Sequence, residues 1–162
     1  MRDAWRIADR DGGKWRLGQL HASAVTGSGR GVLVQLTERG EPWRSIVLGA
    51  FDGDELIGTV TLLLDLPPNQ PHRAEVAKMM TRVSHRHRGI ATALLREAER
   101  LAIARGRWLL VLDTAEDEGA AGLYERMGFK LTGVIPDYAL KPHGGLTGTL
   151  IYWKKLREGV PT

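Results

Sequence analysis

The order of four consecutive segments constrains the fold of this chain more than any other feature. An extended run, Ala74–Arg82, leads through a basic turn into an amphipathic helix that begins near Ile90 and is closed by Gly106. The run that follows, Trp108–Leu112, is entirely apolar, which is typical of a central strand buried on both faces. Strands that alternate with helices in this way predict an α/β fold with a mixed sheet.

The remaining elements are expected on either side of this unit. Further strands are predicted at residues 45–51, 56–65, 129–135 and 149–153, with a hairpin turn at Asp52-Gly53-Asp54. A second helix is predicted over residues 118–127, where Gly128 is suited to a left-handed cap. The first 44 residues carry weaker patterns, which predict a short strand at 5–8, helices at 15–25 and 37–44, and a loop at 26–31. No repeat or linker divides the chain, so a single domain, 1–162, is expected.

The composition excludes several classes of protein. The chain has no cysteine, which rules out disulfides, thiolate metal sites and cysteine nucleophiles. No apolar run approaches the roughly 20 residues of a membrane span, and Met1–Trp5 lacks the apolar core of a signal peptide, so a cytoplasmic protein without membrane partners is expected. The 23 basic residues are interspersed with 19 acidic ones, except for a dense cluster at 82–88. One local cluster favours a small phosphate-bearing ligand over nucleic acid.

That cluster contains the turn Arg86-His87-Arg88-Gly89-Ile90-Ala91. A turn that enters a helix leaves backbone N–H groups without intrahelical partners, and the positive end of the helix dipole adds to them. Gly89 allows a close approach of the backbone, while Arg86 and Arg88 add fixed positive charge. The turn is therefore predicted to bind an anion such as a pyrophosphate.

Two signatures in this order resemble those of the GNAT superfamily of acetyl-CoA-dependent N-acetyltransferases. Arg86-xx-Gly89-x-Ala91 matches the Q/R-xx-G-x-G/A pyrophosphate loop of that family, and Leu123-Tyr124-xx-Met127-Gly128-Phe129 matches its second signature. Residues 67–76, 112–114 and 150–153 further resemble the tabtoxin-resistance-type branch, a group linked to toxin and antibiotic resistance. Residues 1–44, which usually shape the acceptor pocket, match much less well.

The resemblance implies a single-domain GNAT fold, with a mixed and mostly antiparallel sheet that is flanked by helices and splayed at its fourth and fifth strands. It also implies acetyl-CoA as the co-substrate and no metal. The residues expected to contact the cofactor are Met80, Thr81, Arg82, Arg86, His87, Arg88, Gly89, Ile90, Ala91, Thr92, Asp117 and Tyr124. Asp117 stands where many members have asparagine. His85 and His87 are interpreted as solvated neighbours of the cofactor rather than metal ligands.

The implied reaction is direct attack of an amine on the thioester. Glu75 and Asp113 are the two candidates for the base that deprotonates the amine, and Tyr124 is the expected proton donor to the departing thiolate. A packing role for Tyr124, beside Ala120 and Met127, is the alternative. A small molecule with a primary amine is the expected acceptor. The protein itself is expected to be a monomer or a homodimer. The alternatives are a protein or peptide acceptor, and a CoA-binding module that senses without catalysing.

Overall fold

The structure, a computed structural model, describes residues 9–11, 14–16, 24–27, 30–33, 35–39, 45–53, 55–116 and 119–156. The five N-terminal strands are β1 (Asp9–Asp11), β2 (Lys14–Arg16), β3 (Ala24–Gly27), β4 (Arg30–Leu33) and β5 (Gln35–Arg39). The following elements are β6 (Ser45–Asp52), β7 (Glu55–Leu63), β8 (Arg73–Thr81), the 3-10 turn η1 (Val83–His85) and helix α1 (Ile90–Ala104). The chain continues through β9 (Leu109–Ala115), α2 (Ala121–Arg126), β10 (Lys130–Leu140) and β11 (Leu146–Lys155).

Seven of the strands form one sheet, in the order β10-β11-β9-β8-β7-β6-β5. Neighbouring strands in it are antiparallel, except for the parallel pair β8 and β9, which α1 connects. This arrangement confirms the predicted mixed and mostly antiparallel sheet. A connection through a helix is what a parallel pair requires, because a short hairpin can join only antiparallel strands.

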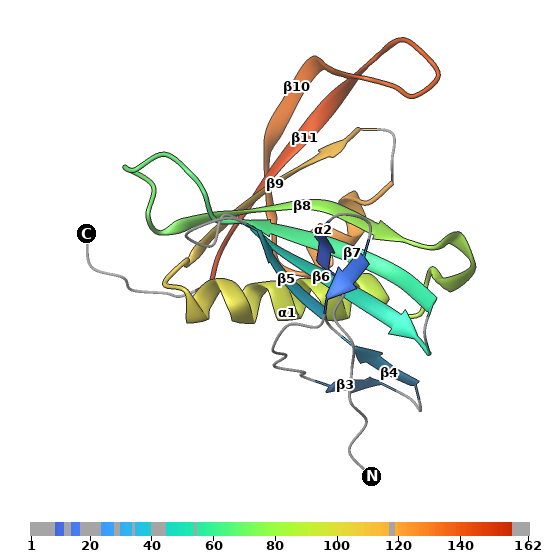
Figure 1. The fold of residues 1–162 in the computed structure, drawn as a ribbon. Helices are drawn as coiled ribbons and strands as arrows, with labels where there is room; N and C mark the ends of the chain where they lie inside the picture. The colour runs from blue at the N-terminus through green and yellow to red at the C-terminus, as the bar shows by residue number, and fades with distance from the viewer. Residues whose placement is uncertain are drawn as a thin grey trace.

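The sheet opens between its fourth and fifth strands in chain order, β8 and β9. Their pairing begins at Arg73 and Leu109 and ends at Val76 and Leu112. Beyond that point the two strands diverge (Figure 1). A register shift between β7 and β8 and a positive φ of 51° at Lys78 mark an irregularity in β8 just past the last pair. Such bulges bend a strand and end its pairing, which accounts for the splay that the resemblance implied.

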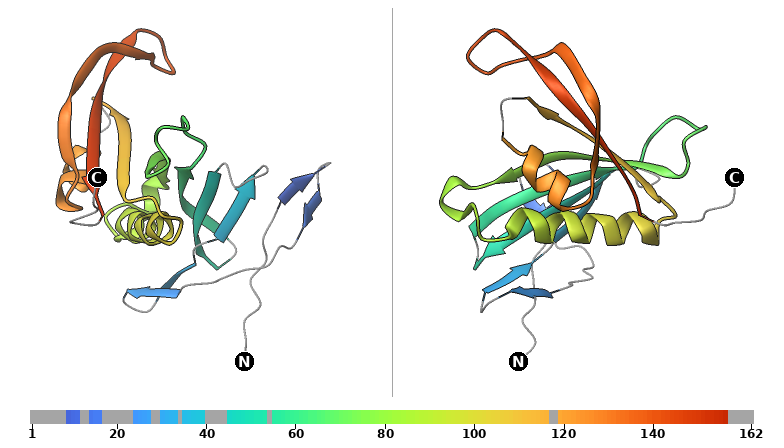
Figure 2. Two further views of the ribbon diagram at one scale, coloured as in Figure 1. Left: turned by 90° about the vertical axis from the view of Figure 1, so that its left-hand side faces the viewer. Right: turned by 180° about the vertical axis from the view of Figure 1, so that it is seen from behind.

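The helices cover one side of the sheet. Figure 2 shows α1 running beneath the strands, with α2 beside it. The Lys154 ammonium connects them, lying 2.6 Å from Glu99 Oε1 of α1 and 2.6 Å from the carbonyl oxygen of Met127, the residue that follows α2. The apolar stripe of α1 faces the sheet, and Leu94 and Ala98 are fully buried. Burial of a leucine side chain of this kind contributes roughly 1.5–3 kcal/mol to the free energy of folding.

The central strand β9 differs from the prediction of burial on both faces. Its alternate residues Leu110, Leu112 and Thr114 are buried against the helices, whereas Val111 is half-buried and Asp113 is exposed. On this second face Leu109 is also only half-buried, although β9 still pairs with β8 there. Every residue from 108 to 112 is apolar, and sequence alone does not reveal that only one face is fully covered.

The predictions for the first 44 residues are wrong where the structure describes them. Trp15 and Arg16 lie in β2, and Ala24 and Val25 lie in β3, so neither end of the predicted 15–25 helix is helical. Residues 37–39 of the second predicted helix lie in β5, which pairs with β6. Of the predicted 26–31 loop, residues 26–27 lie in β3 and residues 30–31 lie in β4, and these two strands pair antiparallel. Pairing with a neighbouring strand overrides a weak helical periodicity here. The strand predicted at 5–8 lies outside the described residues.

The C-terminal elements differ from their predictions mainly in length. Helix α2 is shorter than expected, while β10 and β11 are longer and form a hairpin that projects from the rest of the sheet (Figure 1). No helix in the described part of the chain combines the length and the apolar character needed to cross a bilayer.

Candidate active site

The divergence of β8 and β9 creates a cavity of about 310 Å³. Strand β8 lines one wall, the end of β9 lines another, and the projecting hairpin and α2 contribute the rest. The lining residues are Val76, Ala77, Lys78, Met79, Met80, Asp113, Thr114, Ala115, Tyr124, Tyr138, Ala139, Thr147, Gly148 and Thr149. The cavity thus collects residues from five elements, β8, β9, α2, β10 and β11, at the point where the pairing of β8 with β9 has ended.

Tyr124 reaches this cavity from α2. Only 4% of the residue is exposed, and its ring packs against Phe129 and Tyr152, with ring centroids 6.0 and 5.9 Å away. The neighbouring Tyr152 donates a hydrogen bond from its phenol to the Glu125 carboxylate. Burial, together with this carboxylate, raises the pKa of Tyr152. The Tyr124 ring is therefore held in the core while one part of it borders the cavity. The packing role and the chemical role proposed for this residue are compatible.

The structure separates the two candidate bases. Asp113 lines the cavity, and the buried Thr149 hydroxyl lies 3.4 Å from its Oδ2. Glu75 lies in the part of β8 that still pairs with β9, where its Oε2 is 3.4 Å from Arg73 Nη1. Asp113 is the only carboxylate among the described residues that line the cavity. Tyr124 and Asp113 are thus brought together, and Glu75 is not.

The basic turn lies at the far end of β8, before α1. Arg86, His87, Arg88 and Gly89 are all exposed, and His87 and Gly89 have φ angles of 61° and 79°. Gly89 is the N-cap of α1, and no acidic residue occupies the first turn of that helix. The unpaired N–H groups, the helix dipole and the guanidinium groups together give this end of the molecule the character of an anion site.

The other residues predicted to contact the cofactor lie between the cavity and the first turn of α1. Met80 is 61% exposed and lines the cavity, and Thr81 is half-buried beside it. The Arg82 side chain faces β7 instead, because its Nε donates to the carbonyl oxygen of Leu56 at 3.0 Å. At the start of α1, Ile90 is buried in the core, and Ala91 and Thr92 are half-buried. Asp117 lies outside the described residues.

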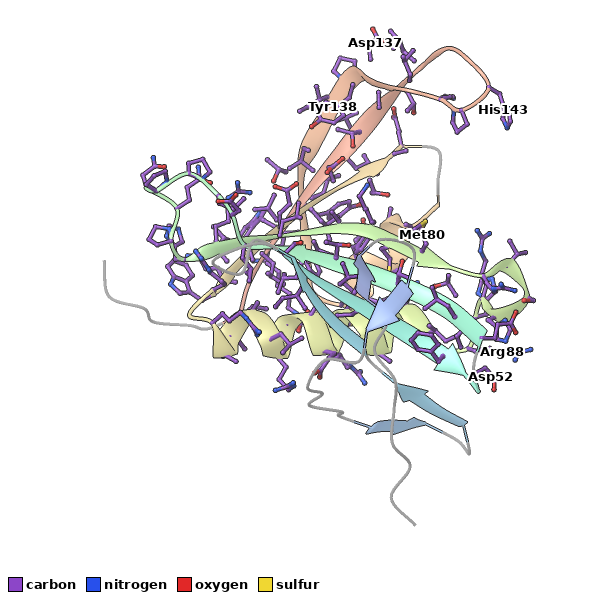
Figure 3. All side chains as sticks on the ribbon, in the orientation of Figure 1. Asp52, Met80, Arg88, Asp137, Tyr138 and His143 are labelled. Atoms are coloured by element: carbon purple, nitrogen blue, oxygen red, sulfur yellow. The ribbon has the colours of Figure 1, made fainter. Side chains whose placement is uncertain are left out.

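Of the residues that line the cavity, the sequence predicted Met80, Asp113 and Tyr124 as site residues, and Tyr138 and Thr149 are among those that it did not indicate. Tyr138 lies on β10 and is 53% exposed (Figure 3). The β10–β11 register shifts between Ile135 and Ala139, and Asp137 has a φ of 52°. A bulge of this kind changes the direction of the side chains next to it. Pro136, which cannot donate to a strand ladder, was the available sequence signal.

Within the described residues, no three histidine, aspartate or glutamate side chains are grouped so that they could hold a metal ion. His85 is not solvated as expected: its side chain is 14% exposed, and its Nε2 lies 3.6 Å from Asp52 Oδ2.

Comparison with known proteins gives consistent results. The model of the acetyltransferase (GNAT) family matches residues 22–129. Human N-acetyltransferase 8B is 37% identical over 82 residues, which make up 49% of this chain and 36% of that protein. The match therefore spans little more than a third of this relative's length.

Two solved structures share the fold at lower identity. An aminoglycoside 6′-N-acetyltransferase complexed with coenzyme A has a TM-score of 0.61 and 20% identity, covering 75% of this chain and 77% of that one. The ribosomal-protein-S18-alanine N-acetyltransferase of Escherichia coli has a TM-score of 0.63 and 19% identity, covering 75% of this chain and 74% of that one. These similarities confirm the predicted fold.

Proposed function

Because this chain belongs to the acetyltransferase (GNAT) family, we propose that it transfers the acetyl group of acetyl-CoA directly to a primary amine of a small molecule. One observation carries the proposal. Among the described residues, the cavity at the β8–β9 splay contains a buried tyrosine, Tyr124, and one carboxylate, Asp113, and the basic turn follows the same strand that lines the cavity.

The turn is assigned to the pyrophosphate of acetyl-CoA. The exposed N–H groups around Gly89 and the guanidinium groups of Arg86 and Arg88 supply donors and positive charge. The pantetheine arm would follow the edge of β8 beyond Val76, which β9 no longer pairs, past Met80. Backbone groups at this free edge are suited to bind the amide groups of the arm and the thioester oxygen as negative charge develops on it.

Asp113 and Tyr124 are assigned the proton transfers. An alkylamine has a pKa of about 10, so it must lose a proton before it attacks the thioester carbon. Asp113 accepts that proton, directly or through water, since it is the carboxylate of the cavity. Attack gives a tetrahedral intermediate, and its collapse forms the amide and breaks the bond between carbon and sulfur. The Tyr124 phenol donates a proton to the departing thiolate, and it recovers a proton, directly or through water, from the attacking nitrogen, which must lose a second proton to become the amide nitrogen. The chain has no cysteine to form an acyl-enzyme.

The size of the cavity supports a small acceptor. A volume of about 310 Å³ lies at the low end of the range for small-molecule pockets, roughly 300–1,000 Å³. Tyr138 and Thr147 of the projecting hairpin offer an aromatic face and a hydroxyl on the side away from the turn. This acceptor class agrees with the resemblance to the tabtoxin-resistance-type branch, which we retain as a proposal.

Calorimetry with acetyl-CoA tests the assignment of the turn. Arg86→Glu reverses a charge, and Gly89→Trp introduces a bulky side chain where φ is 79°. Each change should weaken binding at least tenfold. Lys155→Glu is the matched control, because Lys155 ends β11 and pairs with Leu109, at the opposite end of the β8–β9 pair. Undiminished binding in both turn variants would refute the assignment.

A further inference from the structure

The segment of residues 82–89, called the 82–89 turn below, contains the basic cluster and the glycine that begins α1. Its basic residues divide into two groups. Arg86, His87 and Arg88 are exposed and available to a ligand. Arg82 and His85 instead contact the hairpin of β6 and β7, Arg82 at Leu56 of β7 and His85 at Asp52 of β6. Asp52 and Arg88, labelled in Figure 3, lie at the same end of the molecule. The second group cannot contribute to an anion site in the same way as the first.

His85 is held between two partners. Its Nδ1 lies 2.8 Å from Ser84 Oγ, and its Nε2 lies 3.6 Å from Asp52 Oδ2. The His85 side chain is 14% exposed and that of Asp52 is 38% exposed, so water only partly screens their interaction. Asp52 ends β6, which makes this a contact between segments that are distant in sequence.

Arg82 gives the turn a second attachment to the same hairpin. Its backbone N–H donates to the carbonyl oxygen of Ile57 at 2.9 Å, and its guanidinium group donates to the carbonyl oxygen of Leu56 at 3.0 Å and pairs with Glu55. Arg82 fixes the start of the turn, and His85 fixes its middle.

The conformation of the turn explains why such attachments are needed. His87 adopts a left-handed φ of 61°, and Gly89 follows it with 79°. A non-glycine residue in this region costs on the order of 1 kcal/mol or more and persists when the surrounding structure enforces it. The two residues flank Arg88, so their conformation decides where its backbone and side chain face.

We propose that the contact between Asp52 and His85 holds the 82–89 turn in its anion-binding shape, which makes both side chains positioning residues for the pyrophosphate of acetyl-CoA. This inference rests on the proposed function of the turn. Neither side chain needs to touch the cofactor, because they act through the backbone that carries Arg86, Arg88 and Gly89.

The direction in which removal of the Asp52 charge changes anion binding separates this proposal from simple electrostatics. Asp52 is an acidic group near an anion site, so by Coulomb's law the removal of its charge strengthens the binding of an anion. If Asp52 positions the turn, its removal weakens that binding instead. Removal of His85 is less informative, because both explanations predict weaker binding.

The experiment is a double-mutant cycle on the dissociation constant of coenzyme A, measured by calorimetry for the wild type, Asp52→Ala, His85→Ala and the double variant. Each single change should raise the constant about fivefold to tenfold, and the double variant should bind no more weakly than the weaker single variant. The kcat at saturating acetyl-CoA should stay within about twofold, since the cavity is untouched. Asp52→Asn, which keeps the shape of the side chain, repeats the test with less risk to the hairpin fold.

Asp65→Asn is the control for charge, because Asp65 follows the other end of β7 and should leave the constant unchanged. Binding by Asp52→Ala and Asp52→Asn as tight as in the wild type, or tighter, would overturn the proposal, as would multiplicative effects in the double variant. If wild-type protein does not bind coenzyme A, or if Arg86→Glu binds it normally, the proposed function itself fails. If Arg86→Glu weakens binding while the two Asp52 variants bind coenzyme A as tightly as the wild type, the proposed function stands and only the role of Asp52 is refuted.

Discussion

The hydroxyl of Thr149 lies 3.4 Å from Asp113 Oδ2, across the boundary between β11 and β9. The same hydroxyl donates to the carbonyl oxygen of Thr114 at 3.0 Å. Thr149 is 1% exposed, whereas Asp113 is open to the cavity. A buried polar group thus connects two strands directly behind the only carboxylate among the described cavity residues, and it limits the positions that this carboxylate can adopt.

Thr149→Val should lower both stability and activity. The valine keeps the shape of the side chain but leaves the buried carbonyl oxygen of Thr114 without its donor, so the free energy of unfolding should fall by about 1–2 kcal/mol. The freed Asp113 should lower kcat severalfold. Urea denaturation and steady-state kinetics check this, and Thr149→Ser, which keeps the hydroxyl, should stay closer to wild type in kcat. Equal kcat values in the two variants would show that the hydroxyl does not act on Asp113.

Substitution of the two candidate bases should have unequal effects. Asp113→Asn removes the carboxylate of the cavity and should lower kcat by about 100-fold or more, as expected for loss of a general base. Glu75→Gln should change kcat by less than about threefold, because Glu75 pairs with Arg73 and lies outside the cavity lining. Steady-state rates of amine acetylation measure both. The opposite order of effects would assign the base to Glu75.

Gly58 should be far less tolerant of substitution than Gly133. A Cβ atom at Gly58 would lie 2.9 Å from Ile90 Cγ2 and 3.2 Å from the carbonyl oxygen of Met80, whereas one at Gly133 would meet nothing within 4 Å. Gly58→Ala should therefore cost about 1–3 kcal/mol of stability and raise the KM for acetyl-CoA, since it displaces the start of α1 and the edge of β8. Gly133→Ala is the matched control. Similar unfolding midpoints for the two variants would contradict this packing.

Because of Tyr152, the free energy of unfolding should fall as the pH rises above about 10. Burial and Glu125 raise the pKa of Tyr152 above its ordinary value of about 10, which the unfolded chain retains. Its contribution is therefore complete below about pH 10 and is lost as the pH rises through the folded-state pKa. Unfolding of wild type and Tyr152→Phe in urea from pH 8 to 11 isolates this contribution, because the other titrating groups are common to both. A stability difference that stays constant above pH 10 would refute it.

The part of the fold that surrounds the 86–91 turn was predictable from sequence because local signals agree there. The apolar stripe of α1, the positive-φ glycines at 53, 106 and 128, and the order of strands around the 86–91 turn all indicate the same architecture. The length of the β10–β11 hairpin was not predictable, since β10 is mostly exposed and its pairing with β11 is interrupted around Pro136.

The candidate site was predictable only in its signature residues. Tyr124 and the residues of the turn belong to contiguous motifs, so their positions follow from local sequence. Thr149 and Tyr138 enter the cavity through strand register and a bulge, which are tertiary properties with no strong local signal. The Asp52–His85 contact joins residues 33 positions apart in the chain, and neither residue alone indicates a pair. Glu75 and Asp113 are equivalent in the sequence, and only the end of β8–β9 pairing separates them.

The decisive measurement of the proposed acetyl transfer is the release of thiol from acetyl-CoA in the presence of small primary amines or of lysine peptides. A thiol reagent can follow the reaction without background from the protein, because the chain contains no cysteine. We expect steady release that requires a small amine, and about a tenfold or greater loss of rate in Tyr124→Phe with coenzyme A binding retained. Tight binding of acetyl-CoA without release by any amine would contradict the claim, as would a Tyr124→Phe rate equal to that of the wild type.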